Sequence, residues 1–485
     1  MLKSVCVIGA GLAGGIVAST LAAKGHRVTL VELGDRPAPL RPKDEVWESF
    51  EVQAPFTRGS GIGGSSNFWH GGLTVLDQTD VDGRPFEGRA RAPMPYAELR
   101  QYYERAVALM KGELSYALAD IEAAPSHPVE GFDTDQRAFR LKGLLYPDRP
   151  FSSKSLIQRA QQLHGLEVVP NVEILHLANS GPRHVAYAQG VDSSTGEPKR
   201  FAADLFVLSA GGLGSPKILL RSTETCPSLG KLPIGKYITD HPSGFVLKAK
   251  LRRRMDLAPL FGVPGGGYKI RYGFVLHPDR LGDADGRNHI LYLRPAVSMK
   301  DPSTYDFLKR KLVASRGRSL SALDIAYLLK HADLLFDAVN FKYGLSYSTR
   351  FVSGLVFAEQ MPAADSELRS TDGKRFGIRW EVSTKDCRSL ERFLDAFGKS
   401  FADQFESFTV FPELGKRLDS AGHHSGGCRM AVTLEDGVVD GDLRVFGIDN
   451  LHVADGSTLA YSGHANTGLT IAALALKCCD AVAGA

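Results

Sequence analysis

Three glycines near the N-terminus have the spacing that lets a backbone turn bind phosphate. Gly9, Gly11 and Gly14 form a G-x-G-x-x-G pattern directly after the apolar run 4–8. The first glycine of such a pattern permits a tight turn, the second lets the backbone approach a pyrophosphate, and the third allows a helix to pack closely on a strand. Free N–H groups at the start of the following helix would also face the phosphates. The pattern therefore predicts a dinucleotide-binding turn.

An acidic residue follows at the distance where it would contact a ribose. Glu32 ends the second apolar run, 27–31, roughly 20 residues beyond the glycines. A carboxylate at this place accepts hydrogen bonds from ribose hydroxyls, which favours NAD or FAD over NADP. The fingerprint does not choose between NAD and FAD.

Further glycine-rich junctions occur far along the chain. The loop 59–72 contains six glycines, and its small residues would let the backbone lie against a flat ring system. The apolar run 205–208 leads into Ser-Ala-Gly-Gly, and the run 450–453 is followed by Asp455 and Gly456. Together with the first turn, these junctions predict one nucleotide site that is assembled from discontinuous segments.

Hydrophobic periodicity predicts the strands and helices that hold these residues. The runs 4–8, 27–31 and 205–208 have the length and β-branched content of buried strands. The stretches 15–24, 217–221 and 467–477 are typical of helices, whereas 244–251 and 374–380 are typical of strands.

Composition excludes several classes of protein. The chain has 485 residues, of which 43% are hydrophobic and 23% charged, and its net charge is +4. These values exclude a disordered, collagen-like or disulfide-framework protein. The sequence has no basic block that would bind nucleic acid, no run of the roughly 18–20 apolar residues that cross a membrane, and no cysteine spacing typical of a metal site. We therefore expect no nucleic-acid, membrane or metal partner. We also expect a cytoplasmic protein, because the six cysteines include no C-x-x-C pair and the first strand starts at residue 4 without a leader pattern.

Taken together, these motifs resemble those of the glucose-methanol-choline (GMC) oxidoreductases, an FAD-dependent family that oxidises alcohols. Four segments carry the resemblance in the family's order: 9–32, 63–66, 210–220 with the following Asp240-His241-Pro242, and 423–477. The resemblance implies an α/β fold, α+β overall, with a Rossmann-like FAD-binding domain and an antiparallel-sheet substrate-binding domain with helices.

The resemblance also implies where the two domains lie in the sequence. The FAD-binding domain would be discontinuous and comprise 1–76, 151–242 and 416–485. Residues 77–150 would form a connecting segment, and 243–415 the substrate-binding domain.

The segment His423-His424-Ser425-Gly426-Gly427-Cys428 resembles the family's catalytic motif and places the catalytic histidine on His423 rather than His424. The second catalytic position falls on Asn466, two residues beyond His464. A histidine suits the removal of an alcohol proton because its ordinary pKa of about 6.5 lies near working pH. An amide would donate a hydrogen bond to the developing alkoxide, while a hydride passes to flavin N5. Asn466 would also serve as the N-cap of the last helix.

Carried over residue by residue, the resemblance implies a set of FAD contacts. Phe68 stands where members with covalently bound flavin have a histidine, and His70 lies two positions further on, so we expect FAD to be bound non-covalently. The implied contacts are Gly9, Gly11, Leu12, Gly14, Glu32, Gly63, Gly64, Ser65, Asn67, Val172, Gly211, Asp455, Gly456, Asn466 and Thr467.

The function implied is oxidation of an alcohol, with a sugar or glycosylated metabolite as the expected substrate and O₂ or another acceptor taking the electrons. Two alternatives stay open: a nicotinamide-dependent dehydrogenase and a non-catalytic flavin-binding subunit of a redox complex. We interpret His241 as a structural loop residue and Cys478 and Cys479 as core residues. The segment 305–343 is a candidate lid or partner-docking element because apolar residues recur along it after a basic stretch.

Overall fold

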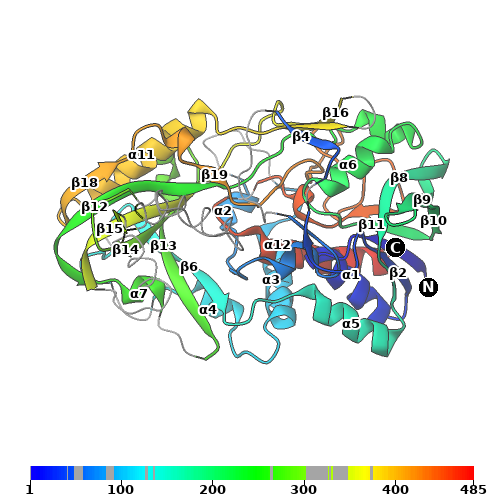
Figure 1. Cartoon of the computed structure of the whole chain (residues 1–485), viewed down its shortest axis with the longest axis horizontal. Helices are drawn as coiled ribbons and strands as arrows, with labels where there is room; N and C mark the ends of the chain where they lie inside the picture. Colours follow the sequence, from blue (N-terminus) through cyan, green and yellow to red (C-terminus); the bar gives the residue numbers. More distant parts are fainter. Residues whose placement is uncertain are drawn as a thin grey trace.

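The computed structural model places two sheets of different kinds at opposite ends of the molecule (Figure 1). A five-stranded parallel sheet lies at one end and a seven-stranded antiparallel sheet at the other. This architecture confirms the expected α/β fold, α+β overall. The structure describes residues 2–40, 42–48, 58–83, 92–125, 129–134, 137–262, 266–301, 326, 329, 330, 332, 348–371, 375–461 and 463–484.

The parallel sheet is built from segments that are far apart in the sequence. Its order is β20 (Leu451–Val453), β11 (Leu205–Leu208), β1 (Ser4–Ile8), β2 (Arg27–Val31) and β7 (Glu167–Val169). Each neighbouring pair runs parallel. A parallel sheet is covered by helices on both faces, which is why its central strands consist of nearly continuous apolar residues.

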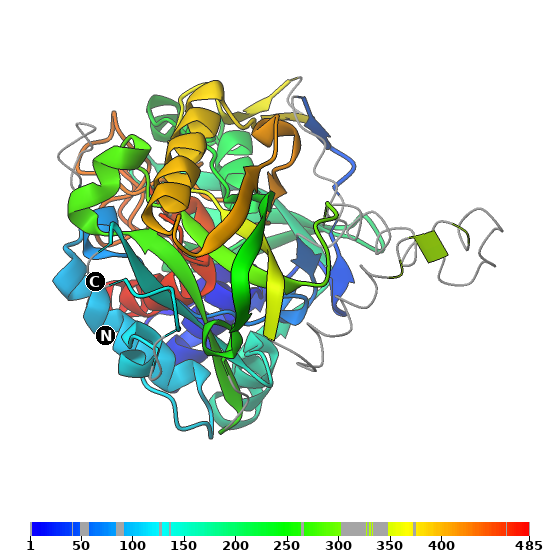
Figure 2. The ribbon, with the colours of Figure 1, turned by 90° about the vertical axis from the view of Figure 1, so that its left-hand side faces the viewer.

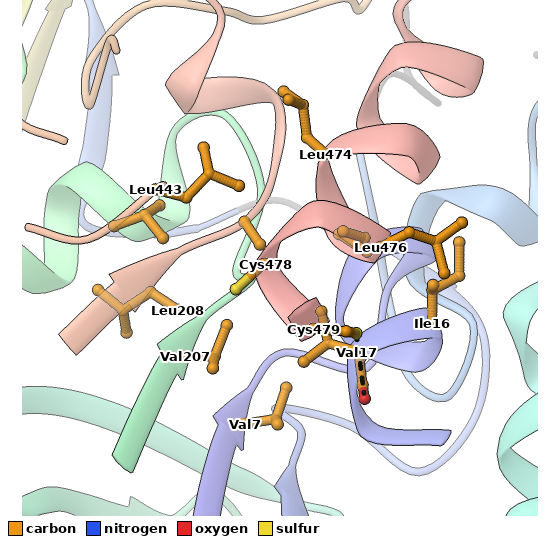
Figure 3. Close-up of a cluster of buried hydrophobic side chains, with 14 of the residues drawn as sticks. Val7, Ile16, Val17, Val207, Leu208, Leu443, Leu474, Leu476, Cys478 and Cys479 are labelled. Atoms are coloured by element: carbon orange, nitrogen blue, oxygen red, sulfur yellow. Dashed lines mark hydrogen bonds between the residues drawn. The ribbon is translucent and has the colours of Figure 1, made fainter. Parts of the chain in front are cut away.

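Four helices pack on one another beside this sheet, and the first of them contacts its strands β1 and β2 directly. They are α1 (Leu12–Ala23), α3 (Tyr96–Met110), α5 (Ser153–His164) and α12 (Thr467–Gly484). Helix α1 contacts both α5 and α12, and α12 in turn contacts α3. Figure 3 shows part of this interior: Ile16 of α1 lies beside Leu476 of α12, and Cys478 of α12 lies beside Val207 and Leu208 of β11.

The two adjacent cysteines of α12 lie in this interior, as the sequence predicts (Figure 3). Cys478 and Cys479 are both fully buried, and burial raises the pKa of Cys479 to about 12. Both are therefore neutral thiols that pack as small apolar side chains. Among the described residues, α12 is also the one helix long and apolar enough to cross a membrane, but 72% of its apolar window is buried inside the protein. This helix is part of the core.

The antiparallel sheet carries the opposite end of the molecule. Its path is β18 (Phe405–Val410), β12 (Pro242–Asp256), β15 (Ser348–Phe357), β14 (Ile290–Ala296), β13 (Tyr268–Leu276) and β6 (Phe139–Pro147), with β19 (Asp419–Ser420) paired to β12. Helix α11 (Thr384–Ser400) lies across it (Figure 2). Phe393 and Phe397 of α11 form edge-to-face ring contacts with Phe139 of β6, which joins the helix to the sheet.

Smaller elements complete the described chain. The strands are β3 (Ala38–Pro39), β4 (Glu45–Trp47), β5 (Gly59–Ser60), β8 (Val172–Gly181), β9 (His184–Asp192), β10 (Pro198–Ala202), β16 (Glu367–Ser370) and β17 (Phe376–Arg379). The short helices are α2 (Gln78–Val81), α4 (Leu118–Glu122), α6 (Gly214–Arg221) and α7 (Ala258–Phe261), with 3-10 turns that include η1 (Gly64–Asn67) and η5 (Gly456–Thr458).

The domain boundaries expected from the sequence stay predictions. One observation bears on them: strand β6 belongs to the segment 77–150, yet it pairs along its whole length with β13 of the large sheet. That segment therefore contributes a strand to the antiparallel layer as well as the helix α3 to the other end. Apart from residues 326, 329, 330 and 332, the candidate lid 305–343 lies outside the described residues.

Candidate functional site

The glycine fingerprint forms the turn between β1 and α1. Gly9 has a φ of +103°, which a residue with a side chain rarely adopts. A Cβ on Gly14 would lie 1.8 Å from the carbonyl oxygen of Gly9, so the start of the helix can approach the strand only without side chains. A Cβ on Gly11 or on Gly211 would instead meet no atom within 4 Å. These two glycines thus leave room for a group that lies against the backbone.

Glu32 connects this turn to the second glycine-rich loop. Its carboxylate accepts hydrogen bonds from the backbone N–H groups of Ala10 at 2.7 Å and Gly61 at 2.9 Å. Burial raises the pKa of Glu32, although these backbone hydrogen bonds act in the opposite direction. The backbone carbonyl of Glu32 also accepts from the N–H of Val172, another predicted contact. The sequence interpretation assigned Glu32 to a ribose alone, and the structure adds a role in holding two loops together.

The loop 59–67 lies directly against the fingerprint turn. The N–H of Gly63 donates to the carbonyl of Ala10 at 2.9 Å, and a Cβ on Gly64 would lie 2.7 Å from the Cα of Gly11. The amide nitrogen of Asn67 donates to two carbonyls of its own loop, and its amide oxygen accepts from Ser152 Oγ at 3.0 Å. Because Ser152 is the N-cap of α5, a second helix N-terminus faces the same place.

The remaining predicted contacts lie at the ends of β11 and β20 and at helix starts. Asp455 accepts from the backbone N–H of Gly211 at 2.9 Å and from Ser215 Oγ at 2.5 Å, so it ties the two strand ends together. Burial raises the pKa of this carboxyl despite these hydrogen bonds. Other predicted residues have the following places: Leu12 begins α1, Ser65 accepts from the N–H of Gly59, Gly456 begins η5 and Thr467 begins α12.

All these groups meet at the carboxyl edge of the parallel sheet. Dinucleotides bind at this edge in doubly wound folds, where helix N-termini face the phosphates. The N-cap of α1 is Gly11, whose missing side chain leaves the first amides of that helix uncapped. The residues present therefore fit a dinucleotide such as FAD.

His423 and Asn466 come together, as the motif predicts. Nε2 of His423 lies 3.5 Å from Nδ2 of Asn466, which precedes the first residue of α12. On the other side of the ring, Nδ1 of His423 lies 2.9 Å from Nδ1 of His241. Burial lowers the pKa of His423 to about 3, so the ring is neutral and has one free lone pair at working pH. This arrangement can accept a proton from a hydroxyl group and hold the oxygen that remains.

Neither neighbouring histidine takes that place. His424 has other neighbours: its Nε2 lies 3.6 Å from Asp240 and its ring 5.9 Å from that of Trp47. His464 is buried beside Asp77, and among the described residues both of its ring nitrogens are without a hydrogen-bond partner.

The surroundings of His464 include the one described group of side chains close enough to hold a metal ion. Ligand atoms of Asp77, Asp80 and His464 lie within 4.8 Å of one another. Asp77 is already paired with Lys142 at 2.8 Å and with Arg140. Although burial opposes it, these cations hold the pKa of Asp77 well below its usual range. The carboxylate charge is thus compensated by two side-chain cations.

Sequence reasoning missed the part that His241 plays at this site. The Asp240-His241-Pro242 motif indicated a structural loop, yet the ring of His241 contacts the ring of His423 directly. The spacing of 182 residues between the two histidines hides this contact. The sequence signal that could have indicated this contact was the Asp240-His241-Pro242 motif, which is one of the segments that resemble the family.

Comparisons with known proteins agree with this geometry. Residues 365–475 match the family model described as GMC oxidoreductase, and residues 7–49 match a model for NAD(P)-binding Rossmann-like domains. The fructose dehydrogenase large subunit of Gluconobacter japonicus is 45% identical over 67% of this chain and 55% of its own length. The 6'''-hydroxyparomomycin C oxidase of Streptomyces lividus is 25% identical over 99% of this chain and 91% of its own.

Other relatives match over shorter stretches. The chain spans only 15% of the length of an Acinetobacter baumannii cholesterol oxidase, at 41% identity, and 52% of a Mycolicibacterium austroafricanum 2-methyl-1,2-propanediol dehydrogenase, at 23% identity.

Among solved structures, pyridoxine 4-oxidase from Mesorbium loti superposes with a TM-score of 0.59 at 18% identity and covers 99% of both chains. A formate oxidase structure gives 0.54 at 16% identity, over 100% of this chain and 98% of its own. At these identities, the two solved structures show that the fold is shared and nothing more.

Proposed function

We propose that this chain is a GMC oxidoreductase that uses FAD to oxidise an alcohol group of a small molecule to a carbonyl. One observation carries the proposal: a neutral histidine, His423, and an amide donor, Asn466, face each other 3.5 Å apart. A hydroxyl group placed between them can lose its proton to His423 Nε2 and receive a hydrogen bond from Asn466 Nδ2.

The chemistry divides between the chain and its cofactor. FAD, when bound, supplies the two-electron acceptor for the hydrogen that leaves the carbinol carbon with its electron pair. The hydroxyl proton goes to His423, and the C–O single bond becomes a carbonyl. The fingerprint turn, the loop 59–67 and the ends of β11 and β20 would hold the cofactor. Phe68 offers no nucleophile, which supports non-covalent binding.

For the substrate we propose a sugar or a glycosylated metabolite. Two similar proteins support this class: one is named a fructose dehydrogenase subunit, and the other an oxidase of a hydroxyparomomycin. For the electrons we propose an acceptor other than O₂, because the relative with 45% identity is a dehydrogenase. The nicotinamide-dependent and non-catalytic alternatives are not favoured.

The test begins with the colour of the purified protein. FAD in the holoenzyme should be visible as a yellow chromophore and should pass into the supernatant on acid precipitation, whereas flavin retained in the washed pellet would contradict non-covalent binding. Sugars and simple alcohols are then screened for bleaching of the flavin without air, followed by reoxidation with a dye or with O₂. A colourless protein, or no bleaching by any alcohol, would overturn the proposal. Rapid reoxidation by O₂ would overturn only the choice of acceptor.

A further inference from the structure

We propose that His241 is a positioning residue that fixes which ring nitrogen of His423 carries a proton. This inference rests on the proposed function, because it concerns how His423 is prepared to accept a proton from an alcohol. It gives a role to a side chain that the catalytic motif does not include.

The contacts of His241 leave its ring little freedom. The side chain is fully buried, with Nδ1 2.9 Å from Nδ1 of His423 and Nε2 2.8 Å from the carbonyl oxygen of Gly463. The two imidazole planes meet at 83°. In this edge-on arrangement, one ring nitrogen can donate to the lone pair of the other.

One carboxylate holds the backbone of both histidines. Asp240 Oδ1 accepts from the N–H of His241 at 2.6 Å and from the N–H of His423 at 3.0 Å. Its second oxygen accepts from Ser420 Oγ at 2.5 Å. Because the two backbones share one acceptor, the distance between the rings is set by the loop rather than by flexible side chains.

The hydrogen-bonding capacity of each atom then determines where the protons are. A carbonyl oxygen can only accept, so Nε2 of His241 must carry a hydrogen to bond with Gly463. In neutral His241 the other nitrogen, Nδ1, is consequently an acceptor. The partner nitrogen, Nδ1 of His423, must therefore be the donor. Neutral His423 is left with its lone pair on Nε2, the nitrogen that faces Asn466.

The opposite side of His423 requires the same arrangement. Nδ2 of Asn466 can only donate, and it faces Nε2 of His423 at the long distance of 3.5 Å. Gly463, His241, His423 and Asn466 form one row of hydrogen-bonding groups. The carbonyl of Gly463 and the amide of Asn466 lie at its two ends, and both favour the tautomer with hydrogen on Nδ1 of His423. In the other tautomer, two N–H groups would face each other at the Asn466 end of the ring, and two lone pairs would face each other at the His241 end.

This arrangement also suits the product of proton transfer. Once Nε2 of His423 accepts a proton, its Nδ1–H continues to donate to His241, now as a charge-assisted hydrogen bond of about twice the strength. The hydrogen bond from His423 to His241 keeps its direction when the charge forms. A serine protease gains similar help from its aspartate, and forcing the wrong tautomer there lowers the rate by about 10⁴-fold.

Two substitutions separate the two hydrogen bonds of His241. His241→Asn places an amide oxygen near the position of Nδ1 and so keeps an acceptor for His423. His241→Gln places its terminal amide near the position of Nε2 and so keeps only the donor to Gly463. As a matched control, His289→Asn alters another buried histidine whose two ring nitrogens are both hydrogen-bonded, to Ser389 and to the N–H of Glu359.

The first readout is ¹⁵N NMR of the holoenzyme with labelled histidine, in which the His423 signals are assigned by their loss in His423→Gln. We expect Nδ1 of His423 to carry the proton in the unsubstituted enzyme, in His241→Asn and in His289→Asn. In His241→Gln we expect this preference to be lost. A proton on Nε2 of His423 in the unsubstituted enzyme would overturn the proposal, even if every variant failed to fold.

The second readout is anaerobic reduction of the flavin by substrate. We expect His241→Gln to be slower by about 10²–10⁴-fold at unchanged FAD content, and His241→Asn to recover at least tenfold of that loss. Equal rates in the two variants would contradict the positioning role. If no alcohol reduces even the unsubstituted enzyme, the proposed function fails while the NMR result still decides the tautomer.

Discussion

Among single residues, we propose two roles for Asn466 that substitution can separate. Its amide faces His423, and it occupies the N-cap position of α12. We predict that Asn466→Ser keeps the melting temperature, because serine is an equally good N-cap, but slows flavin reduction. Loss of one positioned donor costs about 2.7–4 kcal/mol where it has been measured, which is about 10²–10³-fold in rate. Stopped-flow reduction and thermal melting are compared, and a normal rate in the folded variant would show that the amide has no catalytic part.

Glu32 is the second residue whose removal has a specific consequence. Both carboxylate oxygens accept from backbone amides of the two cofactor loops, and glutamine would turn an N–H group toward one of those donors. We predict that Glu32→Gln loses FAD during dialysis, measured as the flavin absorbance that stays with the protein. Glu167→Gln is the control, because Glu167 is an exposed acid of the neighbouring strand β7 that hydrogen-bonds Thr29. Full retention of flavin by Glu32→Gln would refute the assignment.

The sequence could predict that His423 and Asn466 lie close together because each lies in a contiguous motif. It could not predict the partner of His423 nor the loop-bridging role of Glu32. Both depend on hydrogen bonds between segments that only the folded chain brings together. Polar networks of this kind are set by tertiary geometry and have no local periodicity to reveal them.

At the scale of elements, the start of α12 must approach the loop 59–72 closely. A Cβ on Gly468 would lie 2.2 Å from the indole ring of Trp69, whose N–H donates to the carbonyl of Phe151. We predict that Gly468→Ala lowers stability by about 1–3 kcal/mol, the usual cost of overpacking, and weakens FAD retention. The matched control is Gly484→Ala at the other end of the helix, where a Cβ would meet no atom within 4 Å. Equal melting temperatures of the two variants would contradict this packing.

The individual elements followed from local patterns better than their pairing did. The strands 4–8, 27–31 and 205–208 have the predicted bounds, since buried parallel strands are short apolar runs with clear ends. Helix α1 begins at Leu12 rather than at residue 15, because glycine within the fingerprint does not stop the helix. The predicted helix 217–221 begins at Gly214, and the last helix continues to Gly484. Strand β6 received no assignment, because its partner β13 lies more than a hundred residues away.

At the scale of the whole molecule, buried histidines make stability depend on pH. Burial lowers the pKa of His452 to about 4 and that of His464 to about 3, below the ordinary value of about 6.5. As the pH falls below about 6.5, the unfolded chain takes up protons that the folded chain does not, so the free energy of unfolding decreases. We predict that the urea midpoint falls between pH 7 and pH 5. In His452→Gln the free energy of unfolding should decrease by about 2 kcal/mol less over this pH range than in the unsubstituted protein. An unchanged pH dependence in that variant would contradict a neutral buried His452.

The discontinuous assembly of the parallel sheet could be predicted only in part. The order of the parallel strands joins residues 4–8 to 205–208 and then to 451–453, and no local signal specifies such pairing. The sequence predicted only that these segments form one nucleotide site, and their order in the sheet comes from the structure. The cytoplasmic location and the domain boundaries stay predictions.

The role of His423 as the base is tested most directly by anaerobic stopped-flow bleaching of the flavin in three histidine variants, with whichever alcohol reduces the unsubstituted enzyme. His423→Ala should keep FAD and slow reduction by about 10²–10⁴-fold, because the chain loses its general base. His424→Ala and His464→Ala should be much less affected, since the His424 ring lies beside Asp240 and the His464 ring lies beside Asp77 and Asp80. A normal rate in His423→Ala, or a collapse confined to His464→Ala, would show that the proton goes elsewhere.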